Sequence, residues 1–504
     1  MHALLALLLL LWAALQTLGP WADAGTPSSL DGLQRWRVWA SAPDPRLLIV
    51  DIDEPSLAEM AQEFGRWPWP RDTLATVLAH AQAEGATALV FDILFSDADR
   101  LHPGGDQALA AAVRASRIGF FPVARLPQTL DAHSRLTADR LPGLALPPAG
   151  TTPAPTVAVI APFMDAMVRS GRLGSHTIRR DADGALRRFA FSETLPGGWR
   201  LQSMPAAVAA ALGVTVVADA RARPIVWRRH ADAYPRVPFA RLWACAEGRT
   251  TEGCPALGGR ILVLGASATS LHDVHATPLS NQHAGIDVLA TLVDNALHQR
   301  AYAELPPAGR LALAAAALAL AWAAVRRGSA GATRRALLGL PALLLVLGWA
   351  SLHTEAVLLD LALPAGLCLS FLSTVALHDA LRARLHGVDV AAPRGPLALA
   401  CGAPAEAAER LERAVMDEAA AAGLRVSGGP AASGDCGCAQ ALWVVWALAD
   451  HAAAAALADR LRGAVPGTWN TIFEPGPEPQ RALHRTVAAT LPGAPLPSEV
   501  PHAT

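Results

Sequence analysis

Residues 46–53 read RLLIVDID, a continuous apolar run that ends in carboxylates, and this stretch decides the fold of the central part of the chain. Residues 86–95 repeat the arrangement as ATALVFDILF. Helical patterns follow the two runs at residues 71–83 and 106–113. Apolar strands that alternate with helices and are buried on both faces are typical of parallel strands in a layered α/β sheet. We therefore predict a doubly wound or related α/β sandwich with mostly parallel strands.

Several polar residues follow the predicted strands. Asp51 and Asp53 end the first strand, Asp92 lies near the end of the second, and Asp273 and His275 come soon after a later one. The other predicted strands are residues 118–123, 157–161, 185–192 and 260–265. Because such sheets bind ligands beyond the carboxyl ends of their strands, we take these five residues as candidate ligand-binding residues. The alternative interpretation is that the aspartates cap helices and hold turns.

The segment GRWPWPR at residues 65–71 adds a second candidate ligand surface. Its two prolines fix φ and bias the preceding residues toward extended backbone, so Trp67 and Trp69 project as rigid groups between Arg66 and Arg71. Aromatic and guanidinium groups together suit an anion or a planar ligand. Two alternatives remain open: Arg71 forms a salt bridge with the nearby aspartates, or the tryptophans pack over the end of the sheet.

Four apolar runs predict how the chain meets a lipid bilayer. The first, residues 3–15, is either an anchor or a cleaved signal peptide, and both interpretations export the region that comes after it. Three further runs, at residues 311–325, 336–351 and 356–377, lie in close succession with almost no charge between their ends. Such a series predicts three transmembrane helices, although the first two runs are short.

Arginine placement predicts the orientation of these helices. The loop between the first two carries Arg326, Arg327, Arg334 and Arg335, whereas residues 353–355 contain no arginine. Because positively charged loops stay in the cytoplasm, this loop and the C-terminal tail are expected inside and the central α/β region outside. The orientation agrees with the export signal at the N-terminus.

Composition excludes several classes of function. The chain contains no lysine, so a Walker phosphate loop, a Schiff-base mechanism and a protein-kinase active site are excluded. A net charge of −1 without a basic stripe excludes nucleic acid as an expected partner. Cys245 and Cys254 are close in sequence and in the region predicted to be outside, where a disulfide is one interpretation and two free thiols the other.

Three stretches carry a family resemblance. LLIVDIDEPSL at residues 47–57, GRWPWPR at 65–71 and FDILFSDAD at 91–99 closely resemble the opening of the second class of CHASE domain, a bacterial extracellular sensory domain. Later pieces agree in order, namely residues 181–188, 261–280 and 285–297. The resemblance covers about residues 26–380 and implies sensing of an unspecified signal, three membrane spans after the sensor, and dimerisation.

The resemblance and the apolar runs together define the expected domains. These are an N-terminal anchor or signal segment at residues 1–25, a periplasmic sensor domain at 26–302, three transmembrane helices at 303–380 and a small α/β-like cytoplasmic tail at 381–504. The tail carries no kinase, cyclase or diguanylate cyclase motif, so we expect no enzyme there. Cys436 and Cys438 form a lone C-x-C pair, which lacks the second ligand pair of a zinc site, and we expect neither a metal nor a cofactor.

The leading hypothesis is a receptor in the inner membrane of a bacterium. Its expected partners are the lipid bilayer, an unknown ligand or protein outside, a cytoplasmic signalling protein and a second copy of the chain. One alternative is an envelope scaffold that transmits nothing. The other is a phosphohydrolase in which Asp51 attacks phosphate and Asp53 acts as acid and base, but the phosphate-neutralising base of such enzymes is often a lysine.

Overall fold

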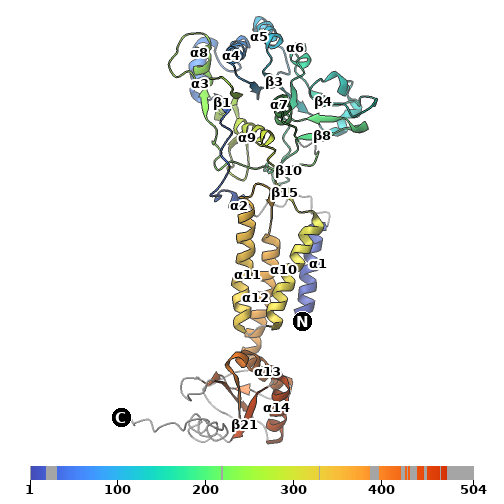
Figure 1. The fold of residues 1–504 in the computed structure, drawn as a ribbon, viewed down its shortest axis with the longest axis vertical. Helices are drawn as coiled ribbons and strands as arrows, with labels where there is room; N and C mark the ends of the chain where they lie inside the picture. The colour runs from blue at the N-terminus through green and yellow to red at the C-terminus, as the bar shows by residue number, and fades with distance from the viewer. Residues whose placement is uncertain are drawn as a thin grey trace, which may run out of the picture. The chain divides into compact units, whose positions relative to one another are not determined.

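The computed structural model describes residues 2–18, 31–216, 220–327, 330–385, 397–421, 426–427, 430–431, 440–447, 451–465 and 467–473. The chain divides into two compact units (Figure 1). The sheet unit comprises Leu15–Arg310 and Leu345–Ala362, and the helical unit comprises Met1–Ala14, Leu311–Leu344 and Leu363–Thr504.

A mostly parallel sheet forms the centre of the sheet unit. Its strand order is β11-β1-β12-β2-β3-β5, with β6 also paired to β3. All neighbours are parallel except β3 and β5. The strands are β1 (Leu47–Ile52), β2 (Ala88–Phe91), β3 (Gly119–Arg125), β5 (Val159–Ile160), β6 (Leu173–Ser175), β11 (Arg236–Pro238) and β12 (Ile261–Ala266). This architecture confirms the predicted α/β class with a mostly parallel sheet.

Alternate residues of β1 face two different cores. Leu48 and Val50 pack into the cluster formed with α3 (Glu54–Phe64), α4 (Asp72–Ala83), α5 (Pro103–Ala115) and α8 (Phe239–Ala246). Leu47 and Ile49 pack into the cluster formed with α7 (Met204–Ala211) and α9 (Gly285–Leu297). Every residue of β1 is buried, which explains why the strand is a continuous apolar run instead of an alternating one.

Short elements surround this sheet. One three-stranded antiparallel sheet has the order β4-β9-β8, and three strand pairs join β7 to β10, β13 to β14 and β15 to β16. Their bounds are β4 (Ala145–Leu146), β7 (Arg188–Phe189), β8 (Ser192–Thr194), β9 (Arg200–Gln202), β10 (Arg223–Pro224), β13 (Val274–His275), β14 (His283–Ala284), β15 (Ala303–Glu304) and β16 (Val357–Leu358). The remaining short helices are α2 (Asp31–Gln34), α6 (Asp165–Arg169) and the 3₁₀ turns Gln128–His133, Ala138–Arg140, Pro196–Gly198 and Thr269–Leu271. A disulfide joins Cys245 to Cys254.

Four apolar helices lie outside the central sheet: α1 (His2–Leu18), α10 (Pro307–Arg327), α11 (Ala330–Ser351) and α12 (Ala362–Leu385). Within the helical unit, Ala13, Ala314 and Leu367 pack together. Among the described residues, only Pro307–Arg326 is both long and apolar enough to cross a membrane. His2–Leu18, Arg335–Ser351 and Ala362–His378 are shorter apolar stretches.

The tail folds as a small antiparallel sheet with two helices. In chain order the elements are β17 (Leu397–Pro404), the 3₁₀ turn Ala405–Ala407, α13 (Ala408–Ala421), β18 (Val426–Ser427), β19 (Pro430–Ala431), β20 (Gln440–Ala447), α14 (His451–Ala464) and β21 (Trp469–Phe473). The strand order is β18-β20-β17-β21, with β19 also paired to β20 and every neighbour antiparallel. This connectivity is the split βαβ arrangement of ferredoxin-like folds. The pair Cys436 and Cys438 lies outside the described residues.

Candidate functional site

A cavity of about 640 Å³ lies beyond the carboxyl ends of the parallel strands. Ile52 at the end of β1, Ala266 at the end of β12, and Asp92 directly after β2 form part of its wall. Gly285, the first residue of α9, also lines it. The cavity therefore occupies the position at which open α/β sheets bind ligands.

Two carboxylates face this cavity, and glycines give them room. A Cβ atom on Gly285 would lie 2.2 Å from Oδ2 of Asp273, and one on Gly265 would lie 2.8 Å from Cβ of Asp92. Any larger residue at either glycine would therefore displace the neighbouring aspartate. Burial, and then the charge of Asp273, raise the pKa of Asp92 from 3.8 to about 7. Placing a charge there costs free energy because water is largely excluded.

The polar lining also includes two imidazoles, two guanidiniums and the hydroxyl residue Thr177. His176, which follows β6, and His275 of β13 both line the cavity. Burial lowers the pKa of each imidazole, so both rings are neutral at pH 7. Arg180 Nη2 donates a hydrogen bond to Nδ1 of His275 at 2.8 Å, and Nε2 of His275 lies 3.7 Å from Oδ1 of Asp273.

The structure places four of the nine sequence-predicted residues in this cavity: Trp67, Asp92, Asp273 and His275. Asp51 lies elsewhere, buried, where it accepts hydrogen bonds from Arg236 at 2.8 Å and from the hydroxyl of Ser267 at 2.8 Å. The Asp53 carboxylate caps α3 by accepting the N–H of Ser56 at 2.8 Å. Asp53 therefore caps a helix, and Asp51 holds the loop after β12 by also accepting the N–H of Ser267.

The GRWPWPR segment divides between the cavity and the core. Trp69 is 3% exposed and stacks on Phe239 with ring centroids 5.1 Å apart. Trp67 meets Trp69 edge to face at 4.9 Å and contributes to the cavity wall, and the Trp67–Pro68 peptide is cis. Arg66 is exposed. Arg71 forms an ion pair with Asp106 at 2.6 Å and donates a hydrogen bond to the carbonyl oxygen of Asp97 at 2.6 Å.

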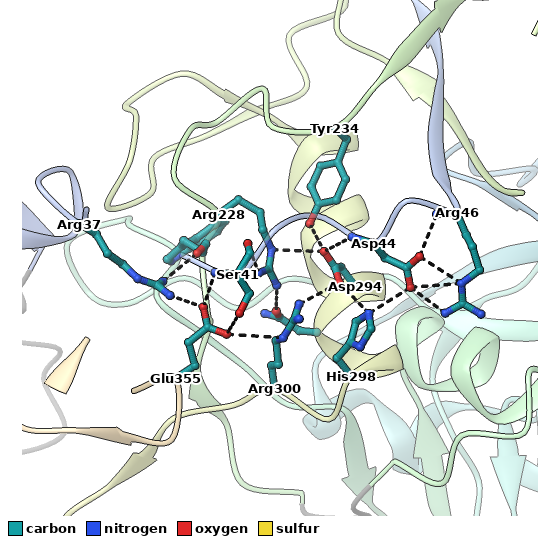
Figure 2. Close-up of polar contacts among 12 residues, drawn as sticks. Arg37, Ser41, Asp44, Arg46, Arg228, Tyr234, Asp294, His298, Arg300 and Glu355 are labelled. Carbon is teal, nitrogen blue, oxygen red and sulfur yellow. Dashed lines mark hydrogen bonds and ion pairs between the residues drawn. The ribbon is translucent and has the colours of Figure 1, made fainter. Parts of the chain in front are cut away.

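A second group of polar residues lies at the other end of α9, and we call it the Asp294 network (Figure 2). Its members are Arg37, Ser41, Asp44, Arg46, Arg228, Tyr234, Asp294, Asn295, His298, Arg300 and Glu355. All of them belong to the sheet unit. None was among the residues selected from the sequence.

The Asp294 carboxylate is fully buried at the centre of this network. Tyr234 donates its hydroxyl to Oδ2 at 2.9 Å, and Arg300 donates Nη1 to Oδ1 at 3.2 Å. Nε of Arg228, a side chain that is 1% exposed, lies 3.3 Å from Oδ2. This contact is an ion pair without hydrogen-bond geometry, because Nε itself has no hydrogen-bond partner within the described part of the chain. Nearby, burial opposes ionisation of Asp44, but the guanidinium and amide of Arg46 outweigh it and lower the Asp44 pKa to about 2.

Glu355 connects the loop between α11 and α12 to this network. It accepts the N–H of Ser41 at 3.0 Å and its hydroxyl at 2.6 Å, and it forms an ion pair with the buried Arg37. Nε of Arg300 lies 3.5 Å from Oε2 of Glu355. Glu355 has a φ of 52°, a conformation that costs a residue with a Cβ about 1–2 kcal/mol. The loop is therefore held by contacts that offset this cost.

Backbone pairing fixes the same loop. Ala303 and Glu304 of β15 pair in parallel with Val357 and Leu358 of β16. The Tyr302 hydroxyl donates to the carbonyl oxygen of Leu352 at 2.7 Å. The segment just before α10 and the loop between α11 and α12 are thus joined within the sheet unit.

The described residues contain no group of three or more His, Cys, Asp or Glu side chains placed to hold a metal ion. Sequence reasoning missed His176 and Arg180, because an isolated histidine or arginine in a loop carries no local signal. It also missed Asp294, although a signal exists. Asp287, Thr291 and Asp294 recur at helical spacing in the otherwise apolar α9 and mark a polar stripe on a buried helix.

The comparisons with known proteins agree with this architecture. The family model of the CHASE2 domain matches residues 2–325 of the 504-residue chain. No curated protein and no solved structure matches the chain. CHASE2 domains are sensory domains and are usually the extracellular sensors of membrane receptors. The match confirms the resemblance carried by the LLIVDIDEPSL, GRWPWPR and FDILFSDAD segments, and the chain belongs to the CHASE2 domain family.

Proposed function

We propose that this chain is a bacterial inner-membrane receptor. Its sheet unit lies in the periplasm and detects a signal, three transmembrane helices come next, and the cytoplasmic tail passes the signal to a separate protein without catalysis of its own. Membership of the CHASE2 family supports the sensory role. Contacts within the sheet unit support coupling of the sensor to the loop between α11 and α12. The composition of the apolar helices supports their insertion in a membrane.

The observation that carries the proposal is the attachment of the loop between α11 and α12 to the sensor. Glu355 of this loop contacts Arg37, Ser41 and Arg300, and β16 pairs with β15 directly before α10. These contacts support a receptor because they give a movement of the sensor a route to the loop between the two helices.

Helix α9 joins the cavity to this loop. Its first residue, Gly285, lines the cavity, and Asp294 lies in its last turn. Arg300 contacts both Asp294 and Glu355. A ligand in the cavity therefore acts on the same helix whose far end holds the loop.

The apolar helices support membrane insertion. Pro307–Arg326 has the length and composition of a span, and Arg335–Ser351 and Ala362–His378 are apolar stretches that complete a three-helix arrangement after the sensor. Arg326, Arg327, Arg334 and Arg335 between the first two favour a cytoplasmic position for that loop.

Thiol labelling tests the orientation. In a chain whose only native cysteines are Cys245 and Cys254, a membrane-impermeant maleimide should label Glu59→Cys in intact spheroplasts. It should label Glu406→Cys only after lysis. Both positions are exposed, so accessibility to water is matched. Labelling of both positions before lysis, or of Glu406→Cys alone, would contradict the proposed topology.

Co-purification tests the output. The full chain and a chain ending at residue 388 are crosslinked in native membranes and purified. A cytoplasmic partner captured only by the full chain supports the receptor. Retention of periplasmic partners by both chains, with no partner that depends on the tail, supports the alternative of an envelope scaffold.

A further inference from the structure

The cavity beyond the central strands contains two carboxylates, of Asp92 and Asp273, that form no ion pair with an arginine of the described residues. Within the described part of the chain, no hydrogen bond or counter-ion reaches the Asp92 side chain, and its pKa responds only to burial and to Asp273. The Asp273 side chain is 44% exposed, and Nε2 of His275 lies 3.7 Å from its Oδ1. Gly265 and Gly285 leave the space that the two carboxylates occupy.

Within the described residues, the arginines of the lining form no ion pair with Asp92 or Asp273. Among the described residues that line the cavity, only Arg125 and Arg180 carry a permanent positive charge. The buried guanidinium of Arg125 pairs with Asp131 at 2.7 Å and with Glu193 at 3.0 Å. Arg180 donates to the neutral ring of His275 and so keeps its own charge, but that charge is not among the influences on Asp92, which are burial and Asp273.

The imidazoles do not supply positive charge beside Asp92 and Asp273. His176 and His275 are both neutral at pH 7 because burial lowers the pKa of each. A neutral imidazole offers one donor and one acceptor and leaves the negative potential of the cavity in place. A cation bound in the cavity would bring positive charge to Asp92, which neither arginine of the lining contacts.

Apart from Thr177, the rest of the wall is apolar. Ile52, Ile93, Leu289 and Leu292 line the cavity together with Trp67. A volume of about 640 Å³ lies in the ordinary range for small-molecule sites, which is roughly 300–1,000 Å³. The site thus combines a negatively charged floor with room for an apolar body.

We propose that the cavity binds a small organic ammonium ligand, with the protonated amine at Asp92 and Asp273 and an apolar body between Trp67 and α9. The proposal rests on the proposed sensory function and names the ligand class of the same domain. A bound cation offsets the repulsion between the two carboxylates. It also stabilises the ionised form of Asp92, which burial otherwise disfavours. A bound anion would be repelled by both carboxylates.

Three probes that share a phenylethyl body and differ in the charge of the head group test the charge requirement. Isothermal titration calorimetry measures binding of 2-phenylethylamine, 2-phenylethanol and 3-phenylpropionate to the full chain in lipid nanodiscs, with empty nanodiscs as the blank. The amine should bind at least about tenfold more tightly than the alcohol, since a charged hydrogen bond contributes that much. The carboxylate should not bind. Equal affinity for the amine and the carboxylate would overturn the proposal.

Matched variants locate the binding. Asp92→Asn removes the charge but keeps the shape and should weaken amine binding about tenfold or more. Asp97→Asn, an exposed aspartate outside the cavity wall, should leave it unchanged. If circular dichroism shows that Asp92→Asn does not fold, Asp273→Asn provides the same test on a more exposed carboxylate. Wild-type affinity in a folded variant of either aspartate would place the ligand elsewhere.

The pH dependence gives an independent readout. Asp92 ionises near pH 7, so amine affinity should rise between pH 5.5 and pH 8. His176, His275 and Asp273 face the same space, and Arg125 and Arg180 keep their charges throughout. Asp92→Asn should remove the Asp92 part of the rise and leave only the part due to the imidazoles. An identical pH profile in the variant contradicts the role of Asp92.

The two proposals fail separately. The chain ending at residue 388 retains the cavity and should bind the amine with wild-type affinity, whatever the tail does. If the full chain captures no cytoplasmic partner but still binds the amine, only the proposed receptor output is refuted. Absent amine binding with intact tail-dependent capture would refute the ligand class alone.

Discussion

Replacing Asp294 by asparagine should destabilise the sensor strongly. The Asp294 side chain is 0% exposed and faces Arg228, which is 1% exposed. Asn keeps the shape but leaves the Arg228 guanidinium buried without its counter-ion. Breaking a buried ion pair from one side costs about 3–5 kcal/mol. Because Arg228 keeps hydrogen bonds to the Ser41 carbonyl oxygen at 3.1 Å and to Asn295 Oδ1 at 2.9 Å, we expect about 3 kcal/mol.

Thermal unfolding of the full chain in detergent measures this loss through tryptophan fluorescence. For a domain of this size the first transition should fall by roughly 2 °C per kcal/mol, or about 6 °C in total. Asp165→Asn is the matched control, because Asp165 and its partner Arg169 are 71% and 80% exposed. An exposed pair of this kind contributes about 0.5 kcal/mol or less.

A double-mutant cycle separates the ion pair from general damage. Arg228→Met removes the other partner, and Asp294→Asn with Arg228→Met removes both. If the pair is coupled as described, the double variant should lose about 2 kcal/mol less than the sum of the single losses. Additive losses, or equal shifts for Asp294→Asn and Asp165→Asn, would refute the reasoning.

Three further predictions concern the loop, the disulfide and the cavity. Glu355→Gln removes the counter-ion of Arg37. The rate of amide hydrogen exchange of residues 352–361 should therefore rise about tenfold, which corresponds to roughly 1.4 kcal/mol of opening free energy, while exchange of β1 stays the same. Unchanged exchange in the loop would contradict this prediction. Replacing Cys245 and Cys254 together by serine opens a loop with a sequence separation of 9, and unfolding free energy should fall by about 2–3 kcal/mol; equal stability of the two chains under non-reducing conditions contradicts this. For Asp92, the raised pKa means that the wild type loses stability as pH rises from about 4 to about 7, so Asp92→Asn should melt higher than wild type at pH 8 and not at pH 4. Parallel melting curves across this pH range would contradict the burial of the charge.

The central sheet was predictable because its signal is local. β1 and β2 are buried on both faces, so their apolar runs identify them without knowledge of their neighbours. The helix α3 was not predicted, although its signals were present. Asp53 is an N-cap and Pro55 occupies the first turn, a combination that marks a helix start. An aspartate at the end of a strand suits a ligand site and a helix cap equally well, so the residue type alone does not decide between them.

The partners of the polar residues were not predictable, because they lie far apart in the sequence. Asp51 pairs with Arg236 across 185 residues, and Glu355 pairs with Arg37 across 318. No spacing rule connects such positions. His176 reaches the cavity only because β6 pairs with β3, an arrangement fixed by tertiary packing. Sequence reasoning therefore found carboxylates at strand ends but could not tell which of them share one space.

Helix α9 is the element best placed to carry a signal from the cavity to the loop. It is buried along all of its length, and Asp294 lies nine residues after Gly285, about 14 Å along the axis. A helix in close-packed surroundings moves as a rigid body between discrete positions. Strand β1 is less suited, because its backbone is bonded to β11 on one side and β12 on the other. A displacement of α9 would change the contact of Asp294 with Arg300, and Arg300 also contacts Glu355 of the loop, so these contacts form the route that the receptor proposal requires.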